Sequence, residues 1–167
     1  YVQLPTQLAE QIEAIVGDAY YAKKGFVNRV IAEVKKPFVG KARKDFNLKH
    51  RYEGSKTGQR GRPKIYDGKV SLTDIARWDG IPWADECIVY TIVAYAVSLK
   101  CWVRMVALLW PTKKGHRLEL LFSTDIHMDA ANIIHLYRSH FAMEFPFRDG
   151  KQFAGLNGCQ SRQTTAI

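Results

Sequence analysis

The sequence predicts an α/β fold that is interrupted by an antiparallel sheet, and three observations support this prediction. Between residues 14 and 43 an apolar run, an amphipathic segment and a second apolar run follow one another, which is the order of a βαβ unit. A long segment rich in Val, Ile, Tyr and Trp comes next, as in β-strands. A segment with helical periodicity closes the chain. The length of 167 residues and the hydrophobic content of 47% suit one folded domain.

The first elements form the βαβ unit. Residues 4–13 carry apolar residues at helical spacing and are expected to form a helix. Residues 14–17 are a short apolar run that ends on Asp18, as in a buried strand that presents a side chain at its carboxyl end. Residues 23–35 carry one apolar stripe and predict a helix, and residues 38–43 predict a returning strand. Because ligand sites in open α/β sheets lie at the carboxyl ends of strands, Asp18 is a candidate site residue.

The next segment is strand-rich. We expect strands at four places between Lys64 and Asp125, namely residues 69–72, 86–98, 99–110 and 117–122. Asp129 fits a helix N-cap, and residues 130–145 predict a helix. The chain is therefore expected to divide into three parts: residues 1–43 as the first part of an α/β core, residues 44–125 as a basic loop and a β-rich insertion, and residues 126–167 as the C-terminal core helix.

A basic, glycine-rich loop, residues 53–63, lies in the first part of the predicted insertion. The net charge is +9, which suits a polyanion such as nucleic acid, and the cations concentrate between Lys35 and Lys64. Two interpretations are open for this loop. It is either a solvated hairpin tip or a loop that follows a phosphate backbone, in which glycines let the chain approach and arginines make forked contacts. The second interpretation assigns DNA binding to Arg60, Arg62 and Lys64.

Four polar or aromatic residues near the C-terminus are spaced three, four and seven positions apart: Tyr137, His140, Glu144 and Lys151. On a helix this spacing places an aromatic ring, an imidazole, a carboxylate and an amine close to one face. These are the groups needed to hold a metal ion beside a phosphodiester. Two-metal phosphoryl transfer needs carboxylates from separate elements, and Asp18 with Glu144 forms such a pair.

This constellation resembles the Tyr-x2-Arg-x3-Glu-x6-Lys signature of bacterial insertion-sequence transposases with an Asp-Asp-Glu triad. Segments 15–26, 61–70, 122–125 and 144–162 resemble further family motifs in the same order, so the resemblance covers most of the chain. It implies a ribonuclease H-like transposase catalytic core, truncated, with an antiparallel β insertion. It also implies Mg²⁺ or Mn²⁺ as cofactor and double-stranded DNA, at transposon ends and target, as substrate.

The resemblance also implies residue roles. Asp18 is expected to be the second catalytic, metal-binding carboxylate and Glu144 the third, while Tyr137, His140 and Lys151 contact DNA. The family places its first Asp upstream, so the chain reads as a fragment that alone cannot catalyse. A homodimer in a DNA complex and a cytoplasmic, nucleoid-associated location in a bacterium are further expectations from the resemblance. No membrane association is expected from the sequence itself, because its most apolar stretch, residues 87–99, is too short to span a bilayer.

Asp125 is a competing carboxylate, because it also follows a predicted strand. Its alternative role is structural, through bonds to nearby backbone amides. The corresponding structural roles for Asp18 and Glu144 are a turn residue and a solvated helix carboxylate. The tryptophans are expected to anchor the core or sheet, with Trp78 and Trp83 the better candidates for base stacking.

Three residues depart from the family pattern. His140 replaces an Arg and lacks its permanent charge and forked geometry. Pro146 removes a backbone donor and is expected to kink the helix after Glu144, and Gly150 weakens the helix further. These departures keep two other interpretations open: a catalytically dead DNA-binding remnant of a decayed mobile element, and a basic α/β domain with no nucleic-acid role.

Overall fold

The computed structural model describes residues 11–55, 62–72, 76–83 and 86–153. The chain divides into two compact units, residues 1–137 and residues 138–167. The first unit contains the β-sheet, and the second begins within the C-terminal helix α3 (Ala130–Phe153). Most of the helix expected at residues 4–13 lies outside the described residues.

The predicted βαβ unit is confirmed. Strand β1 (Ile15–Gly17) is followed by helix α2 (Lys24–Arg29), which continues as the π-helical turn η1 (Val30–Val34) and leads to strand β2 (Phe38–Lys41). β1 and β2 are parallel neighbours. Lys35, directly after η1, adopts the left-handed conformation with a φ of 55°. This ends the helix just ahead of Pro37, which cannot continue it easily.

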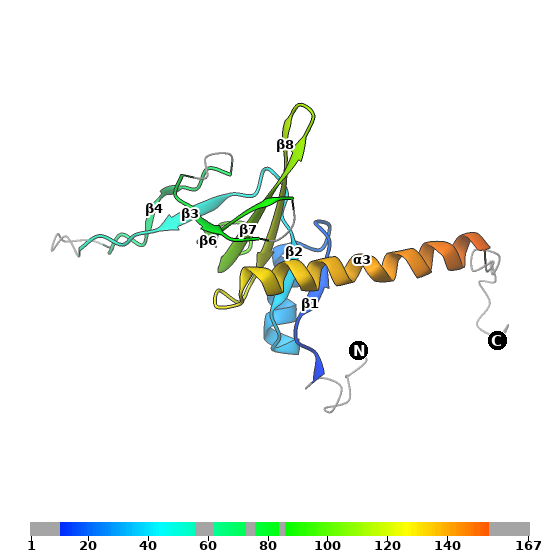
Figure 1. The fold of residues 1–167 in the computed structure, drawn as a ribbon. Coiled ribbons are helices and arrows are strands. Elements are labelled where there is room, and N and C mark those ends of the chain that lie inside the picture. The colour runs from blue at the N-terminus through cyan, green and yellow to red at the C-terminus, as the bar shows by residue number, and fades with distance from the viewer. Residues whose placement is uncertain (1–10, 56–61, 73–75, 84–85, 154–167) are drawn as a thin grey trace. The chain divides into compact units, whose positions relative to one another are not determined.

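The remaining strands extend the same sheet. They are β3 (Leu48–Arg51), β4 (Tyr66–Lys69), β5 (Asp79–Ile81), β6 (Ile88–Ala96), β7 (Cys101–Thr112) and β8 (Gly115–Ser123). The sheet has the order β1-β2-β8-β7-β6-β3-β4 (Figure 1). Strand β5 also pairs with β6. All of these added pairings are antiparallel. The expected antiparallel strands are therefore present, and they continue the sheet of the βαβ unit through the pairing of β2 with β8.

Several element boundaries differ from the prediction. The expected strand at residues 69–72 lies earlier, as β4, and the short strands β3 and β5 were not predicted. Tertiary pairing forms these strands, because both β3 and β5 lie against β6. The helix predicted to end at residue 145 continues to Phe153.

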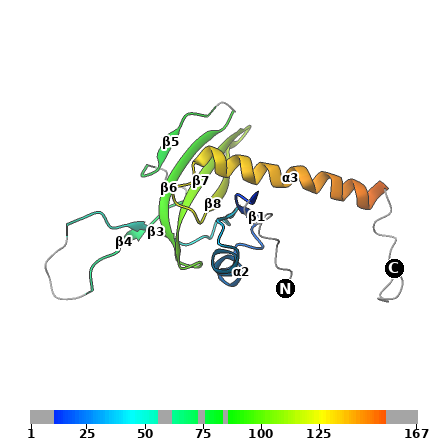
Figure 2. The same cartoon turned by 90° about the horizontal axis from the view of Figure 1, so that it is seen from below.

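Two hydrophobic clusters pack on opposite faces of the sheet. Successive side chains of β2 point to opposite faces of the sheet. Phe38 packs in one cluster with Val27 of α2 and Val30 of η1. Val39 packs in the other cluster, with Ile133 of α3. Figure 2 shows α2 and the start of α3 on either side of the strands. In the first unit, α2 with η1 and the start of α3 therefore pack on opposite faces of the sheet.

Gly40 of β2 has almost no room for a side chain, which gives a stability prediction. A Cβ at this position would lie 2.7 Å from the ring of Phe38, whose side chain is fully buried, and 3.2 Å from the Gly17 carbonyl oxygen. We expect Gly40→Ala to lower the free energy of unfolding by about 1–3 kcal/mol, as overpacked cores do.

The matched control is Gly25→Ala in α2, where a Cβ would meet nothing within 4 Å. Ala favours a helix over Gly by about 0.5–1 kcal/mol, so the control variant should be slightly more stable. Urea unfolding of both variants measures the difference. Equal stability of the two variants would contradict the close packing at Gly40.

Candidate functional site

Asp18 lies directly after β1 and is exposed. Its Oδ1 accepts a hydrogen bond from the Tyr20 backbone N–H at 2.9 Å, which closes a local turn. Within the described residues no partner reaches its Oδ2. The carboxylate is therefore held at the carboxyl end of a parallel strand with one oxygen open to a ligand, as expected for this position in an α/β sheet.

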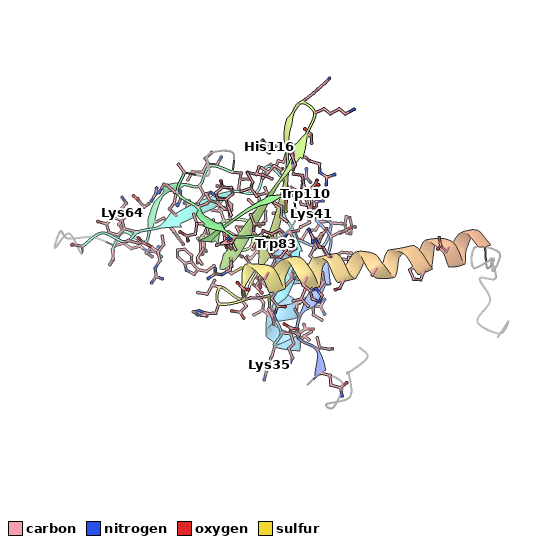
Figure 3. The ribbon with its side chains drawn as sticks, viewed as in Figure 1. Lys35, Lys41, Lys64, Trp83, Trp110 and His116 are labelled. Carbon is pink, nitrogen blue, oxygen red and sulfur yellow. The ribbon has the colours of Figure 1, made fainter. Side chains whose placement is uncertain are left out.

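A charged pair lies at the same edge of the sheet. Lys41 ends β2, and its Nζ donates to Glu119 Oε1 of β8 at 2.8 Å. Because Gly17 pairs with Gly40, the carboxyl end of β2 adjoins Asp18, and Figure 3 labels Lys41 there. Sequence reasoning missed this pair because its two residues are 78 positions apart and only the β2–β8 pairing brings them together.

Asp125 lies at the opposite edge. It follows β8, whose Ser123 pairs with Val39, so Asp125 comes beside the amino end of β2. Its Oδ1 accepts a bond from the His127 N–H at 2.9 Å, which is the structural role that the sequence left open. The strand register therefore separates Asp125 from Asp18.

Helix α3 contains all four residues of the C-terminal constellation. Tyr137 belongs to the first unit, is only 3% exposed, and packs in the core cluster with Val39. Its ring therefore anchors the helix to the sheet, and its contact with DNA stays a prediction.

The other three members of the constellation belong to the second unit. Positions 140, 144 and 151 lie on the same helix, where they fall within about 40° of one face at about 3.6 residues per turn. Neither Pro146 nor Gly150 ends the helix, and the kink expected after Glu144 stays a prediction. Their metal-binding and DNA-binding roles stay predictions.

Pro146 within α3 gives a second stability prediction. Proline removes the backbone donor to the carbonyl of the residue four positions earlier, at a cost of about 3 kcal/mol in a helix interior. Because its side chain is exposed, Pro146→Leu should increase the helicity of α3. The double variant Pro146→Leu with His140→Arg should have a higher melting temperature than the unaltered protein.

Circular dichroism at increasing temperature tests this, with Pro82→Leu as the control. Pro82 is exposed and lies after β5, outside any helix, so the same chemical change there should leave helicity unaltered. An unchanged melting temperature for the Pro146 variant would count against a weak point in α3.

The basic loop lies in the hairpin between β3 and β4. Arg60 lies outside the described residues, whereas Arg62 and Lys64 are exposed. The Nζ of Lys64 donates to Asp67 Oδ1 at 3.0 Å and lies 4.6 Å from the centre of the Tyr52 ring. This hydrogen bond and the charge of Lys64 hold the pKa of Asp67 below its usual value. The hairpin fits both interpretations of the loop, and the assignment of DNA contacts stays a prediction.

The tryptophans occupy different environments. Trp78 is 6% exposed within the core cluster on the α2 face, so its ring offers no face for stacking. Trp83 and Trp110 are half-buried and pack against the cluster that contains Ile133 (Figure 3). The expected role of core anchor is confirmed for these three tryptophans.

Within the described residues, no group of three or more His, Cys, Asp or Glu side chains gathers in a way that could hold a metal ion. No helix in the part of the chain that the structure describes is long and apolar enough to cross a membrane.

Comparison with known proteins identifies the family. Neither the curated proteins nor the solved structures gave a match. The family model of the transposase DDE domain matches residues 2–167, which is nearly the entire chain. The parallel β1–β2 pair with Asp18 at its carboxyl end and the helix that carries Glu144 are consistent with such a domain. The chain therefore belongs to the transposase DDE domain family.

Proposed function

We propose that this chain is the part of a bacterial insertion-sequence transposase core, ribonuclease H-like in fold, that extends from the second catalytic Asp to the catalytic Glu. The intact protein would cleave DNA at transposon ends and join it to a target. The family match carries this proposal. The parallel strand that ends on the exposed Asp18 supports it, because this is where α/β sheets bind ligands.

The proposed site residues are Asp18 and Glu144, as ligands of Mg²⁺ or Mn²⁺. Carboxylate oxygens are the ligands that these hard cations prefer, and the open Oδ2 of Asp18 fits such a role. When bound, the metal would activate the attacking oxygen and stabilise the leaving oxygen of the phosphodiester. Asp18 would hold its ligand oxygen in place through the turn that its other oxygen closes with Tyr20.

We further propose that DNA is held by the cations of the β3–β4 hairpin, Arg60, Arg62 and Lys64, and by His140, Lys151 and Tyr137 of α3. The net charge of +9 favours duplex DNA through phosphate contacts. Residues 44–125 would serve as the insertion of the core, and two copies would act together on a pair of transposon ends in the bacterial cytoplasm.

Iron-directed backbone cleavage tests the metal site without requiring catalysis. Fe²⁺ that replaces Mg²⁺ produces hydroxyl radicals with ascorbate and peroxide, and these cut the polypeptide near the bound ion. We expect cuts next to residues 18 and 144, which excess Mg²⁺ suppresses and Asp18→Asn removes at both positions. Cuts that appear only elsewhere, or that persist in Asp18→Asn, would overturn the site.

A second candidate function is a DNA-binding remnant that has lost catalysis. The substitution of His140 for the signature Arg and the presence of Pro146 within α3 favour it. In that case the protein would bind duplex DNA with a steep dependence on salt, but the intact parent would not cleave it in Mg²⁺ or Mn²⁺.

A further inference from the structure

Three aromatic side chains form a continuous surface on strands of the insertion. Tyr66 of β4, Tyr95 of β6 and Trp102 of β7 have ring centres 4.8 Å apart for Tyr66–Tyr95, 5.5 Å for Tyr95–Trp102 and 6.1 Å for Tyr66–Trp102. A hydrogen bond between the two tyrosines, followed by partial burial, raises the pKa of Tyr95. We call these three residues the aromatic platform.

The platform does not belong to the hydrophobic core. Each of its rings is half-buried, and neither core cluster includes any of the three. On the opposite face of the same strands, Leu48 pairs with Ala96, and both are fully buried in the core cluster on the α2 side. The platform therefore lies on the face of the sheet opposite the α2 cluster and outside both hydrophobic clusters of the described residues.

Cations surround the platform. Cross-strand pairing places Lys49 opposite Tyr95 and Arg51 opposite Tyr66, so all four side chains share one face. Lys49 Nζ lies 5.0 Å from the centre of the Tyr66 ring, and the Arg51 guanidinium lies 6.0 Å from that of Trp102.

These cations are available to a ligand. Lys49, Arg51 and the neighbouring Lys69 form no ion pair within the described residues. The nearby carboxylate of Asp67 is already shared by Lys64 and Arg77. Within the described residues, the platform therefore carries positive charge that no ion pair balances, beside aromatic rings that are partly exposed.

We propose that the aromatic platform binds single-stranded DNA, with unpaired bases stacked on Trp102 and Tyr66 and the phosphates held by Lys49 and Arg51. Stacking on aromatic rings beside a basic track is the general means of holding unpaired strands, because every base has a π-face. The proposal rests on the proposed function, since a DNA-cleaving parent would bring separated strands to this domain.

The proposed catalytic site and the proposed strand-binding platform can be tested separately. Metal-directed cleavage at residues 18 and 144 reports on the proposed catalytic site, whereas strand binding in metal-free buffer reports on the platform. The platform residues are not among the proposed metal ligands, so either result can be negative while the other is positive.

Fluorescence anisotropy of a short labelled oligothymidylate with the full 167-residue chain tests the proposal. We expect tighter binding to this strand than to a blunt duplex of the same length or to a matching RNA strand. Trp102→Ala should weaken single-strand binding about five- to a hundredfold, the range for losing one stacked base. Trp102→Tyr should restore most of it, because a stacking ring returns.

The matched control is Tyr90→Ala. Tyr90 is a half-buried aromatic of the same strand β6 as Tyr95, but it packs against the opposite core cluster, so its loss should leave single-strand affinity unchanged. Photocrosslinking of an iodouracil-containing strand provides a measurement that needs no variant, with cross-links expected at Trp102 or Tyr66. Preference for the duplex or RNA, a folded Trp102→Ala variant with undiminished binding, or cross-links only outside the platform would overturn the proposal.

Discussion

Replacing Asp18 with Asn is expected to lower DNA cleavage by the proposed intact transposase about a thousandfold or more. The change keeps the size of the side chain and its bond to the Tyr20 N–H, but it removes the negative charge that would hold a divalent cation in the proposed site. Loss of the metal removes several kcal/mol of stabilisation from the transition state, and about 1.4 kcal/mol corresponds to a tenfold change in rate. Glu144→Gln should have a similar effect.

Single-turnover cleavage of a labelled transposon end in Mg²⁺ measures both variants. Asp45→Asn provides the control, because Asp45 is an exposed carboxylate that pairs with Arg43 at 3.3 Å outside the proposed site. Duplex binding should be unchanged in all three variants. A cleavage rate of Asp18→Asn within tenfold of the unaltered protein would remove Asp18 from the proposed triad.

The largest expected loss of stability follows from Phe122→Ala. Phe122 of β8 is fully buried, and its ring stacks on Phe46 at 5.4 Å and contacts Phe38 at 5.8 Å between ring centres. Truncating a buried Phe leaves a cavity and costs about 3–5 kcal/mol, which is a large fraction of the stability of a typical domain.

Phe26→Ala is the control for this prediction. Phe26 is 40% exposed on α2, so its truncation removes less buried surface and should cost markedly less. Urea unfolding followed by intrinsic fluorescence measures both variants. A similar loss for the two would show that Phe122 is not central to the core on this face of the sheet.

The sequence predicted those elements whose local pattern and tertiary environment agree. The βαβ unit was visible because the stripe containing Val27 and Val30 faces the core, and the turn chemistry after Asp18 is local. β3 and β5 escaped prediction because they are short and depend on pairing with β6, which no local pattern encodes.

The candidate site was predictable only in part, for the same reason. The position of Asp18 at a strand end could be read from an apolar run followed by a carboxylate. The separation of Asp125 from it could not, because both residues follow apolar strands and only the antiparallel register of β2 and β8 distinguishes the two edges. The aromatic platform was invisible because Tyr66 of β4 comes beside Tyr95 of β6 and Trp102 of β7 only in the folded sheet.

The pairing of β2 with β8 has a consequence for the evolution of such a domain. Because the β-rich segment is hydrogen-bonded into the same sheet as the βαβ unit, it cannot be removed as an independently folded module would be. Deleting the β-rich segment would leave the backbone groups on one side of β2 unpaired and would expose Phe38. The exposed edge strand would then be prone to pair with another copy of the chain. Lineages that shorten this region must therefore trim loops or outer strands first and retain the hairpin that borders β2.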